Sequence, residues 1–232
     1  KFIDSGIIVS TKSRLTFENS VYRATAKATV LSKGIPVVVL INKGSASASE
    51  ILAGALKDDH LAYLVGERTY GKGSVQQVVP LPNSDGIKLT MARYYTPSDS
   101  NIDKIGIPPD KEVLLPVLSE SEEKAYANLV TDGTIAKYAE SHPNMSEKDI
   151  AAYAKELQKN YNLELRLLRR LIKLEVNRKK PADLYDLDYD LQLQAALETL
   201  KLPNFNALVQ SAKTIKELQA EAAPETAQTA KK

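Results

Sequence analysis

The 232-residue sequence has no cysteine, only two histidines, and no apolar run long enough to cross a membrane. The absence of cysteine excludes disulfides, thiolate catalysis and cysteine-ligated metals, and it leaves the redox compartment open. The longest apolar run, 35–41, has the length of a strand, whereas a membrane-spanning helix needs about 20 apolar residues. The first residues lack the basic start and apolar core of a signal peptide, and we interpret Lys1 as the cut end of a longer protein.

An excess of charge of one sign is also absent. The 31 basic and 29 acidic residues give a formal charge of +2, so the charge does not favour nucleic acid or a membrane surface as a partner. The basic residues between Arg166 and Arg178 alternate with leucines, as is typical of a solvated helix face. The hydrophobic content of 43% is sufficient for a core in one large or two small domains.

Residues 1–118 alternate strand and helix signals, which predicts an α/β fold. A helix is predicted over 47–59, and strands over 6–10, 35–41, 62–65, 75–81 and 87–95. Because the run 35–41 is apolar on both faces, it predicts a central strand covered on both sides. The turn residues 82–86 predict a hairpin between the last two strands.

Strand signals end near Ser119, and Leu, Ala, Lys and Glu dominate the sequence that follows. Four helices are predicted there: one capped by Ser146, one over 167–174 that ends before Pro181, one over 190–200 and one over 206–218. The last residues are too polar to pack and are expected to be disordered. The expected organisation is a core over 1–118, a helical domain over 119–219 and a disordered tail over 220–232.

A Ser-rich turn, Gly44 to Glu50, separates the predicted strand 35–41 from the predicted helix. Ser47 and Glu50 form the pattern of an ordinary capping box, and for the serine alone a helix cap is the favoured interpretation. The alternative is a nucleophile, because the free N–H groups and the positive dipole end of a helix start are suited to hold an oxyanion.

A nucleophilic serine needs a base, and the two histidines are poor candidates. His60 lies thirteen residues after Ser47, which corresponds to about 20 Å along a helix. His142 lies in the helical region, and nothing in the sequence ties it to this serine, although the fold could bring it round. A Ser-His-Asp triad is therefore disfavoured.

Lys72 is the remaining candidate base. A lysine in a largely apolar pocket loses its charge and can act as a general base, and the flanking Gly71 and Gly73 allow close approach. If residues 72–79 are extended, Lys72 and Gln76 share a face, so that the amide can hold the amine in place. A solvated turn is the plain alternative for a lone lysine in such a loop.

The same lysine completes the first seven positions of a phosphate-binding loop, Gly66 to Lys72. The eighth position is Gly73, where Ser or Thr is needed for magnesium, and the following residues predict a strand rather than the required helix. The sequence therefore does not support nucleotide binding.

Three motifs in this order and spacing resemble the carboxy-terminal processing peptidases, also called tail-specific proteases. They are Asn-Lys-Gly-Ser-Ala-Ser-Ala-Ser-Glu-Ile (42–51), Val-Gly-Glu-Arg-Thr-Tyr-Gly-Lys-Gly-Ser-Val-Gln-Gln (65–77) and Gly-Ile-Pro-Pro-Asp (106–110). The resemblance extends from about Gly6 to Asp110, roughly half of the chain. It implies a spiral α/β core of the crotonase or Clp-protease type.

The resemblance also implies which residues act. It places the nucleophile on Ser47 rather than on the flanking serines, the general base on Lys72 and the lysine-positioning glutamine on Gln76. The Ala48 N–H would be one oxyanion donor. The implied reaction is peptide-bond hydrolysis through an acyl-enzyme, without a metal or cofactor.

Substrates implied by the resemblance are proteins or peptides cut near apolar C-termini, in the bacterial periplasm or cell envelope. Members of the family carry a PDZ domain and a Gly-Gly turn with the second oxyanion donor, both upstream of the position matching Lys1. Loss of one donor lowers the rate by about 10²–10³-fold, so we expect weak or no activity from this chain alone.

The helical region after Ser119 matches none of the motifs, and we interpret it as a module for homo-oligomer or adaptor contacts. The alternative function is a catalytically inactive fragment that acts as a helical scaffold or adaptor. Loss or retention of activity on substitution of Ser47 and Lys72 separates the two.

Overall fold

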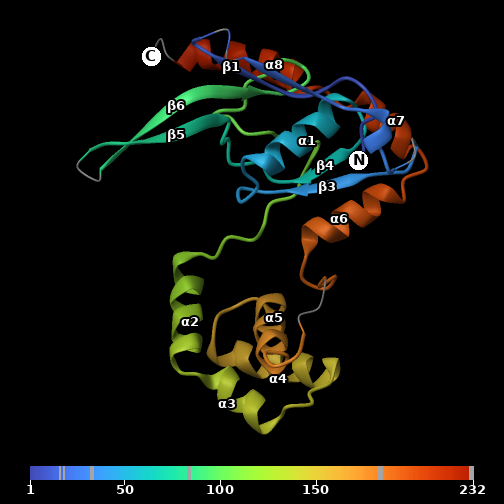
Figure 1. Ribbon diagram of the computed structural model, residues 1–232. Coiled ribbons are helices and arrows are strands. Elements are labelled where there is room, and N and C mark those ends of the chain that lie inside the picture. The colour runs from blue at the N-terminus through green and yellow to red at the C-terminus, as the bar shows by residue number, and fades with distance from the viewer. Residues whose placement is uncertain (16, 18, 32–33, 83–84, 182–184, 230–232) are drawn as a thin grey trace. The chain divides into compact units, whose positions relative to one another are not determined.

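The computed structural model describes the chain except for residues 16, 18, 32–33, 83–84, 182–184 and 230–232. The chain divides into two compact units, one formed by Lys1–Leu114 with Ala195–Lys232 and the other by Leu115–Gln194. The first contains both strands and helices and the second is helical (Figure 1). The predicted α/β class is thereby confirmed.

The first unit contains a four-stranded antiparallel sheet in the order β2-β1-β6-β5. Its strands are β1 (Ile7–Ser13), β2 (Ser20–Arg23), β5 (Ser74–Pro80) and β6 (Gly86–Tyr95). β5 and β6 form the predicted hairpin, which extends away from the rest of the unit in Figure 1; residues 83–84 of its turn lie outside the described residues. Neither β2 nor the short 3₁₀ helix η2 (Ala26–Ala28) was firmly predicted from the sequence.

A parallel sheet in the order β3-β4-β7 is formed by β3 (Val38–Ile41), β4 (Tyr63–Gly66) and β7 (Lys111–Glu112). The prediction of a central strand over 35–41 is wrong: β3 lies at the edge of this sheet, and Leu40 is 40% exposed. An apolar run predicts burial, but the number of neighbouring strands depends on distant segments that local sequence does not contain.

The helix α1 (Ala48–Asp58) connects β3 to β4, as predicted. The core beside it consists of Ile41, Ala53, Leu56, Ala62, Leu64, Ile102, Ile107 and Ile215. The buried face of α1 differs from the predicted apolar stripe, since Leu52 is 47% exposed whereas Glu50, Lys57 and Asp58 are buried. Apolar spacing cannot reveal polar residues whose partners come from other segments.

Three helices lie near the C-terminus: α6 (Leu191–Leu200), α7 (Phe205–Ser211) and α8 (Ile215–Thr229). The prediction of one helix over 206–218 followed by a disordered tail over 220–232 differs from the structure, in which there are two helices and α8 continues to Thr229; residues 230–232 of the tail lie outside the described residues. The break arises because the Thr214 hydroxyl and N–H both donate to Glu217 at 2.8 Å, which starts a new helix.

The C-terminal helices also change the domain division. Ile215 is fully buried in the core of the first unit, and its N–H donates to Asp58 Oδ1 at 2.8 Å. Gln219 Nε2 donates to the Asn101 carbonyl at 2.7 Å. Residues 195–232 therefore belong with the first unit, whereas the sequence placed 119–219 in one domain; a change in composition marks helices but not the core against which they pack.

The second unit contains α2 (Glu120–Thr131), α3 (Thr134–Ser141), α4 (Glu147–Asn160) and α5 (Leu165–Val176). Ser146 caps α4, and α5 ends before Pro181, as predicted; α2 and α3 were not predicted. Its core consists of Leu129, Ile150, Tyr153, Ala154, Leu157, Leu163, Leu168 and Ile172. Within the described part of the chain, no helix has the length and apolarity needed to cross a membrane.

Candidate active site

A tight turn between β3 and α1 fixes Ser45. The Asn42 carbonyl accepts the Ser45 N–H at 2.9 Å, and the Asn42 N–H donates to Ser45 Oγ at 3.1 Å. Asn42 Oδ1 also accepts the Gly44 N–H at 2.8 Å. The hydroxyl of Ser45 is thus part of the turn, while Ser49 is exposed in the first turn of α1.

Ser47 is the N-cap residue of α1 and has a positive φ, with φ 57° and ψ −115°. Glu50 Oε2 accepts the N–H of this half-buried serine at 2.9 Å, which is the Glu50 half of the predicted capping box, while the Glu50 N–H donates to the Ser47 carbonyl at 3.0 Å. A positive φ at a non-glycine residue costs about 1–3 kcal/mol and occurs frequently at functional sites. A simple helix cap does not require it.

The Ala48 N–H is the first of α1. No hydrogen bond joins it to another described residue, as expected for an N–H in the first turn of a helix. The partial positive charge of the helix start lies at this position. A carbonyl oxygen that becomes negatively charged beside Ser47 could be stabilised there.

Lys72 lies in the loop between β4 and β5, and two glycines fix the backbone on either side of it. Gly71 has φ 87°, and a Cβ there would lie 2.9 Å from backbone atoms of the segment 103–106. A Cβ at Gly73 would lie only 2.5 Å from the same segment, and the Lys104 N–H donates to the Gly71 carbonyl at 2.8 Å. Glycine is needed because the neighbouring backbone occupies the space of a side chain.

The side chain of Lys72 is exposed, which corrects the prediction of a largely apolar pocket around it. The Gln76 amide donates to Thr90 Oγ1 at 3.5 Å, and among the described residues Lys72 Nζ forms no hydrogen bond with Ser47 Oγ or with this amide. The expected shared face depended on an extended chain from Lys72 onward, but β5 begins only at Ser74.

A buried carboxylate joins the serine turn to the lysine loop. Glu50 is fully buried and accepts four hydrogen bonds. Its Oε2 accepts the N–H groups of Ser47 at 2.9 Å and Lys72 at 2.8 Å. Its Oε1 accepts the Gly71 N–H at 2.7 Å and the Thr69 hydroxyl at 2.5 Å. Because Ser47 and Lys72 donate to the same oxygen, their amide nitrogens lie within two hydrogen-bond lengths of each other.

The third motif, 106–110, meets the other two at Thr69. While its hydroxyl donates to Glu50, Thr69 Oγ1 accepts the Ile107 N–H at 2.7 Å. Gly106 has φ 71°, and a Cβ there would lie 2.2 Å from the Thr69 carbonyl oxygen. The three motifs therefore converge on the pair Glu50 and Thr69.

Asp110 ends the third motif and forms a buried ion pair with Lys57 of α1. Their side chains are only 6% and 1% exposed, and Asp110 Oδ2 also accepts the Leu64 N–H at 2.8 Å. Burial, and then the negative charge of Asp110, raise the pKa of Tyr63. The ion pair ties α1 to β4, at a desolvation cost that only close pairing offsets.

At the C-terminal end of α1, Asp58 accepts the N–H groups of Ile215 at 2.8 Å and Ser98 at 3.0 Å. Asp58 thus holds two backbone segments against the end of α1. Burial, and then the negative charge of Asp58, raise the pKa of the neighbouring Asp59.

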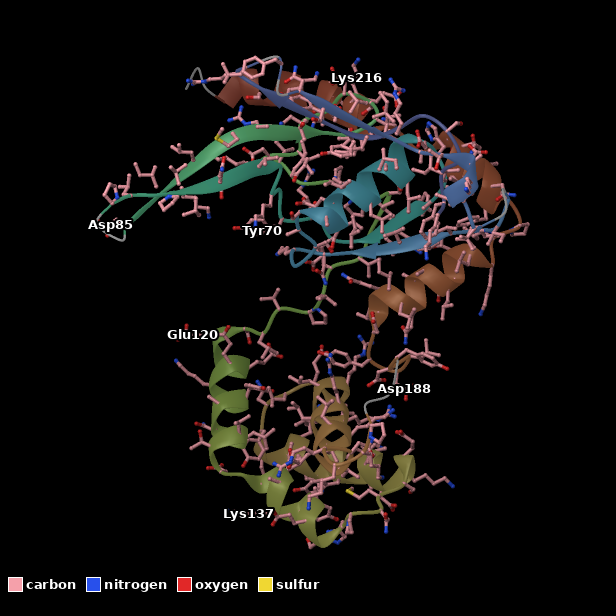
Figure 2. The ribbon with its side chains drawn as sticks, viewed as in Figure 1. Tyr70, Asp85, Glu120, Lys137, Asp188 and Lys216 are labelled. Carbon is pink, nitrogen blue, oxygen red and sulfur yellow. The ribbon has the colours of Figure 1, made fainter. Side chains whose placement is uncertain are left out.

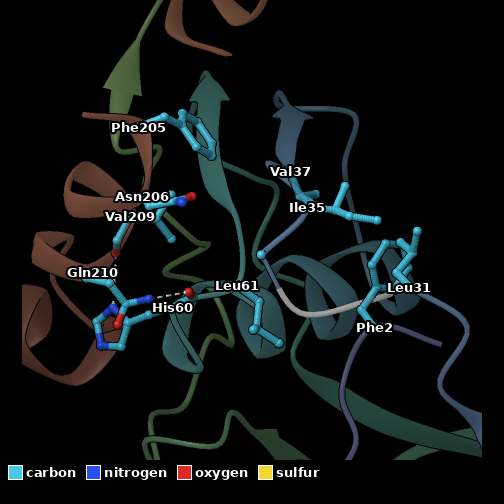
Figure 3. Close-up of a pocket in the computed structure, with 11 residues that line it drawn as sticks. Phe2, Leu31, Ile35, Val37, His60, Leu61, Phe205, Asn206, Val209 and Gln210 are labelled. Atoms are coloured by element: carbon cyan, nitrogen blue, oxygen red, sulfur yellow. Dashed lines mark hydrogen bonds between the residues drawn. The ribbon is translucent and has the colours of Figure 1, made fainter. Parts of the chain in front are cut away.

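A pocket of about 280 Å³ lies at the same end of α1, with mainly apolar lining (Figure 3). His60 lies at its edge, with Nδ1 3.3 Å from the Val209 carbonyl oxygen, and its own carbonyl accepts Gln210 Nε2 at 3.0 Å. The 11 residues of α1 place this pocket about 16 Å along the helix from Ser47, so it is separate from the candidate active site. The ring of His142 stacks on Tyr138 in the second unit.

Tyr70 provides a further link between the two loops. Its N–H donates to the Ser45 carbonyl at 3.0 Å. Its side chain is 68% exposed and projects from the loop that carries Lys72 (Figure 2). An exposed aromatic ring at this position can contact a peptide chain.

Sequence reasoning treated Glu50 only as a capping residue and did not single out Thr69. A signal for Glu50 is present in the helix, where the residues 50, 53, 54, 57 and 58 are small or charged and recur at the spacing of one helix face. All five are buried. Charged residues on a face with small neighbours indicate close approach of another segment with polar groups.

The family model described as Peptidase family S41 matches residues 1–113, which contain all three motifs. A carboxy-terminal-processing protease of Bartonella bacilliformis is 49% identical over 116 residues, which are 50% of this chain and 26% of that protein. The chloroplastic carboxyl-terminal-processing peptidase 2 of Arabidopsis thaliana is 50% identical over 103 residues, 44% of this chain and 20% of that protein. The chain thus spans between a fifth and about a quarter of the length of these relatives.

Among solved structures, the photosystem II D1 C-terminal processing protease is 42% identical, with a TM-score of 0.42 over 48% of this chain and 28% of that chain. The second unit, Leu115–Gln194, lies outside the family match. The family model and the sequence relatives agree with each other: residues 1–113 are similar to peptidase family S41 and to carboxy-terminal-processing proteases.

Proposed function

We propose that this chain carries the nucleophile and the base of a serine endopeptidase that processes proteins or peptides near apolar C-termini. One observation carries the proposal: the N–H groups of Ser47 and Lys72 both donate a hydrogen bond to Glu50 Oε2. A helix cap accounts for the first bond but not for the second. The names of the relatives, which are carboxy-terminal-processing proteases, support the same activity.

In the proposed reaction, Ser47 Oγ attacks the carbonyl carbon of the scissile peptide bond while the neutral Lys72 amine takes the hydroxyl proton. The Ala48 N–H stabilises the oxyanion of the tetrahedral intermediate. The C–N bond then breaks, and Lys72 returns the proton to the leaving amine. Water hydrolyses the acyl-enzyme on Ser47, with Lys72 again as the base.

Lys72 is exposed in the free chain, so the substrate has a second role in this proposal. A bound apolar segment would remove water from the lysine side chain, and desolvation favours the neutral amine. Gln76 would then orient that amine. Exclusion of water from Lys72 by the apolar substrate would then explain both the preference for apolar C-termini and the activation of the base.

The proposed context follows the family resemblance. The complete catalytic core would have the crotonase-like spiral fold and an associated PDZ domain, and the protein would act in the periplasm or cell envelope. The reaction uses only side-chain and backbone groups of the protein. The second unit is proposed to make oligomer or adaptor contacts.

A fluorophosphonate serine probe tests the assignment directly, with mass spectrometry to locate the modified residue. In a protein that joins this chain to the upstream Gly-Gly turn and PDZ domain, we expect labelling at Ser47, none in Ser47→Ala, and normal labelling in Ser49→Ala, which removes a neighbouring hydroxyl as the matched control. Lys72→Ala is expected to slow labelling by about 10²–10⁴-fold, the usual contribution of a general base. Absence of labelling at Ser47 in the wild type, or wild-type rates in Lys72→Ala, would favour the inactive helical scaffold instead.

A further inference from the structure

Glu50 has more hydrogen bonds than its place in α1 explains. In a capping box, a Glu at this position accepts one bond from the backbone of the cap residue. Glu50 accepts that bond and three more, all from residues 69–72. A carboxylate buried without such partners would be strongly destabilising, so the lysine loop and Glu50 depend on each other.

The four bonds use the acceptor capacity of an ionised carboxylate, which has about four lone-pair sites and no donor. Each carboxylate oxygen accepts two of these bonds, and the two oxygens bind different kinds of residue. Oε2 holds the two residues proposed to react, Ser47 and Lys72, whereas Oε1 holds the supporting groups of Gly71 and Thr69. The orientation of the carboxylate therefore sets the distance between the nucleophile turn and the base loop.

Thr69 fixes that orientation from the other side. Its hydroxyl donates to Glu50 Oε1 at 2.5 Å and accepts the Ile107 N–H at 2.7 Å, and both groups are buried. The hydroxyl proton is therefore directed to the carboxylate. The third motif is coupled in this way to the first two.

The geometry points to Glu50 as a positioning residue, oriented by Thr69, that sets the spacing and orientation of Ser47 and Lys72 for the proposed reaction. The inference rests on the proposed function. Glu50 is fully buried, so it acts through backbone N–H groups rather than by contact with substrate. Its hydrogen bond to Ser47 also stabilises the positive φ of that residue.

Glu50→Gln is the direct test, because it keeps the shape of the side chain and replaces one oxygen by an NH₂ donor. At the Oε2 position that donor would face the N–H groups of Ser47 and Lys72, and at the Oε1 position it would face the Gly71 N–H and the Thr69 hydroxyl. A displacement of about 1 Å between reacting groups can cost about 10²-fold in rate. We expect kcat per active site to fall about 10²-fold with KM unchanged. Titration with the fluorophosphonate probe counts the competent molecules, so partial unfolding lowers the titrated fraction but not kcat per titrated site.

A second pair of variants keeps the test decisive if Glu50→Gln does not fold. Thr69→Val has nearly the same volume but lacks the hydroxyl, whereas Thr69→Ser retains it. We expect kcat per titrated site to fall about tenfold in Thr69→Val, the size of one lost hydrogen bond, and to recover in Thr69→Ser. Wild-type kcat per titrated site in Glu50→Gln, or in Thr69→Val, would overturn the inference.

The two proposals fail in different ways. The proposed function fails if the wild-type protein that includes the upstream region is not labelled at Ser47, or if Ser47→Ala retains activity. The positioning role fails if labelling and cleavage depend on Ser47 and Lys72 as proposed but are unaffected by Glu50→Gln and Thr69→Val.

Discussion

The two units of this chain place their polar groups differently. Among the described residues, every buried polar or charged residue except Gln192 lies in the first unit. Four non-glycine residues in the described part of the chain have a positive φ, and all four, Ser47 included, belong to the first unit. In the second unit, the core is apolar, and capping boxes at Ser119 and Ser146 carry exposed hydrogen bonds.

This difference separates two uses of polar groups. Exposed caps stabilise local helices and can be read from adjacent residues. Buried charges such as Glu50 contribute little net stability, because desolvation offsets much of the attraction. They do specify which segments meet, and in the first unit they connect three separate sequence motifs.

The largest effect on stability is expected from Lys57→Met, which breaks the buried pair with Asp110. The substitution keeps the length of the side chain but leaves a buried carboxylate without its cation, which costs about 3–5 kcal/mol. Hydrogen exchange measured by mass spectrometry should show faster exchange in α1 and β4. The second unit should be unaffected.

Lys124→Met is the matched control, because it removes an exposed lysine, 72% accessible, from an ion pair with Glu120. Such a pair contributes about 0.3–0.5 kcal/mol, and exchange should remain close to that of the wild type. If hydrogen exchange changed by a similar amount in Lys57→Met and Lys124→Met, the contrast between buried charges in the first unit and exposed charges in the second would be wrong.

A comparison of Ile215→Ala with Ile172→Ala tests the division of the chain. Both isoleucines are fully buried, and each substitution should cost about 2–5 kcal/mol. Because Ile215 packs in the core of the first unit, its variant should show faster exchange in α1, whereas Ile172→Ala should affect α4. Faster exchange of α4 in Ile215→Ala would return the C-terminal helices to the helical domain that the sequence predicted.

The elements predicted correctly from the sequence have local signals. The cap and apolar face of α4, the hairpin β5–β6 and the helix α1 each depend on residues close together in the chain. The edge position of β3 and the packing of α8 do not, since both are decided by contacts across the chain. Composition alone could not distinguish a helix of the second unit from one that completes the first core.

The same limit applies to the candidate site. The spacing of the motifs singled out Ser47 and Lys72 as candidates, and the glycines around the lysine were correctly expected to allow close approach of another backbone segment. The joining group, Glu50, was described only as part of a cap because three of its four donors lie about twenty residues further along the chain. The exposure of Lys72 could not be predicted either, since burial of a loop depends on what covers it.

The smallest effect is expected at the cap of α4, where Ser146 and Asp149 interact. The Ser146 hydroxyl and N–H donate to Asp149 Oδ2 at 2.6 and 2.8 Å, and these bonds, the side-chain bond first, lower the pKa of Asp149. Because the folded state binds the proton more weakly than the unfolded chain, this group stabilises the second unit above the ordinary Asp pKa of about 3.9. The contribution is lost as the pH falls through the lowered value in the folded state.

Ser146→Ala should therefore lower the Tm of the second unit at pH 7, and lower it less at an acidic pH below the lowered pKa of Asp149, where the carboxyl group is protonated in both proteins. Part of the difference should remain at that acidic pH, because Ser146 Oγ also accepts the Asp149 N–H at 3.3 Å, a bond that does not depend on the carboxylate charge. Calorimetry at both pH values measures the two parts, with Ser141→Ala as a control, because this exposed hydroxyl donates to the carbonyl groups of Lys137 and Tyr138 rather than to a carboxylate. A Tm difference that is the same at both pH values would show that the carboxylate contributes nothing, and that this cap depends on the hydroxyl acceptor alone.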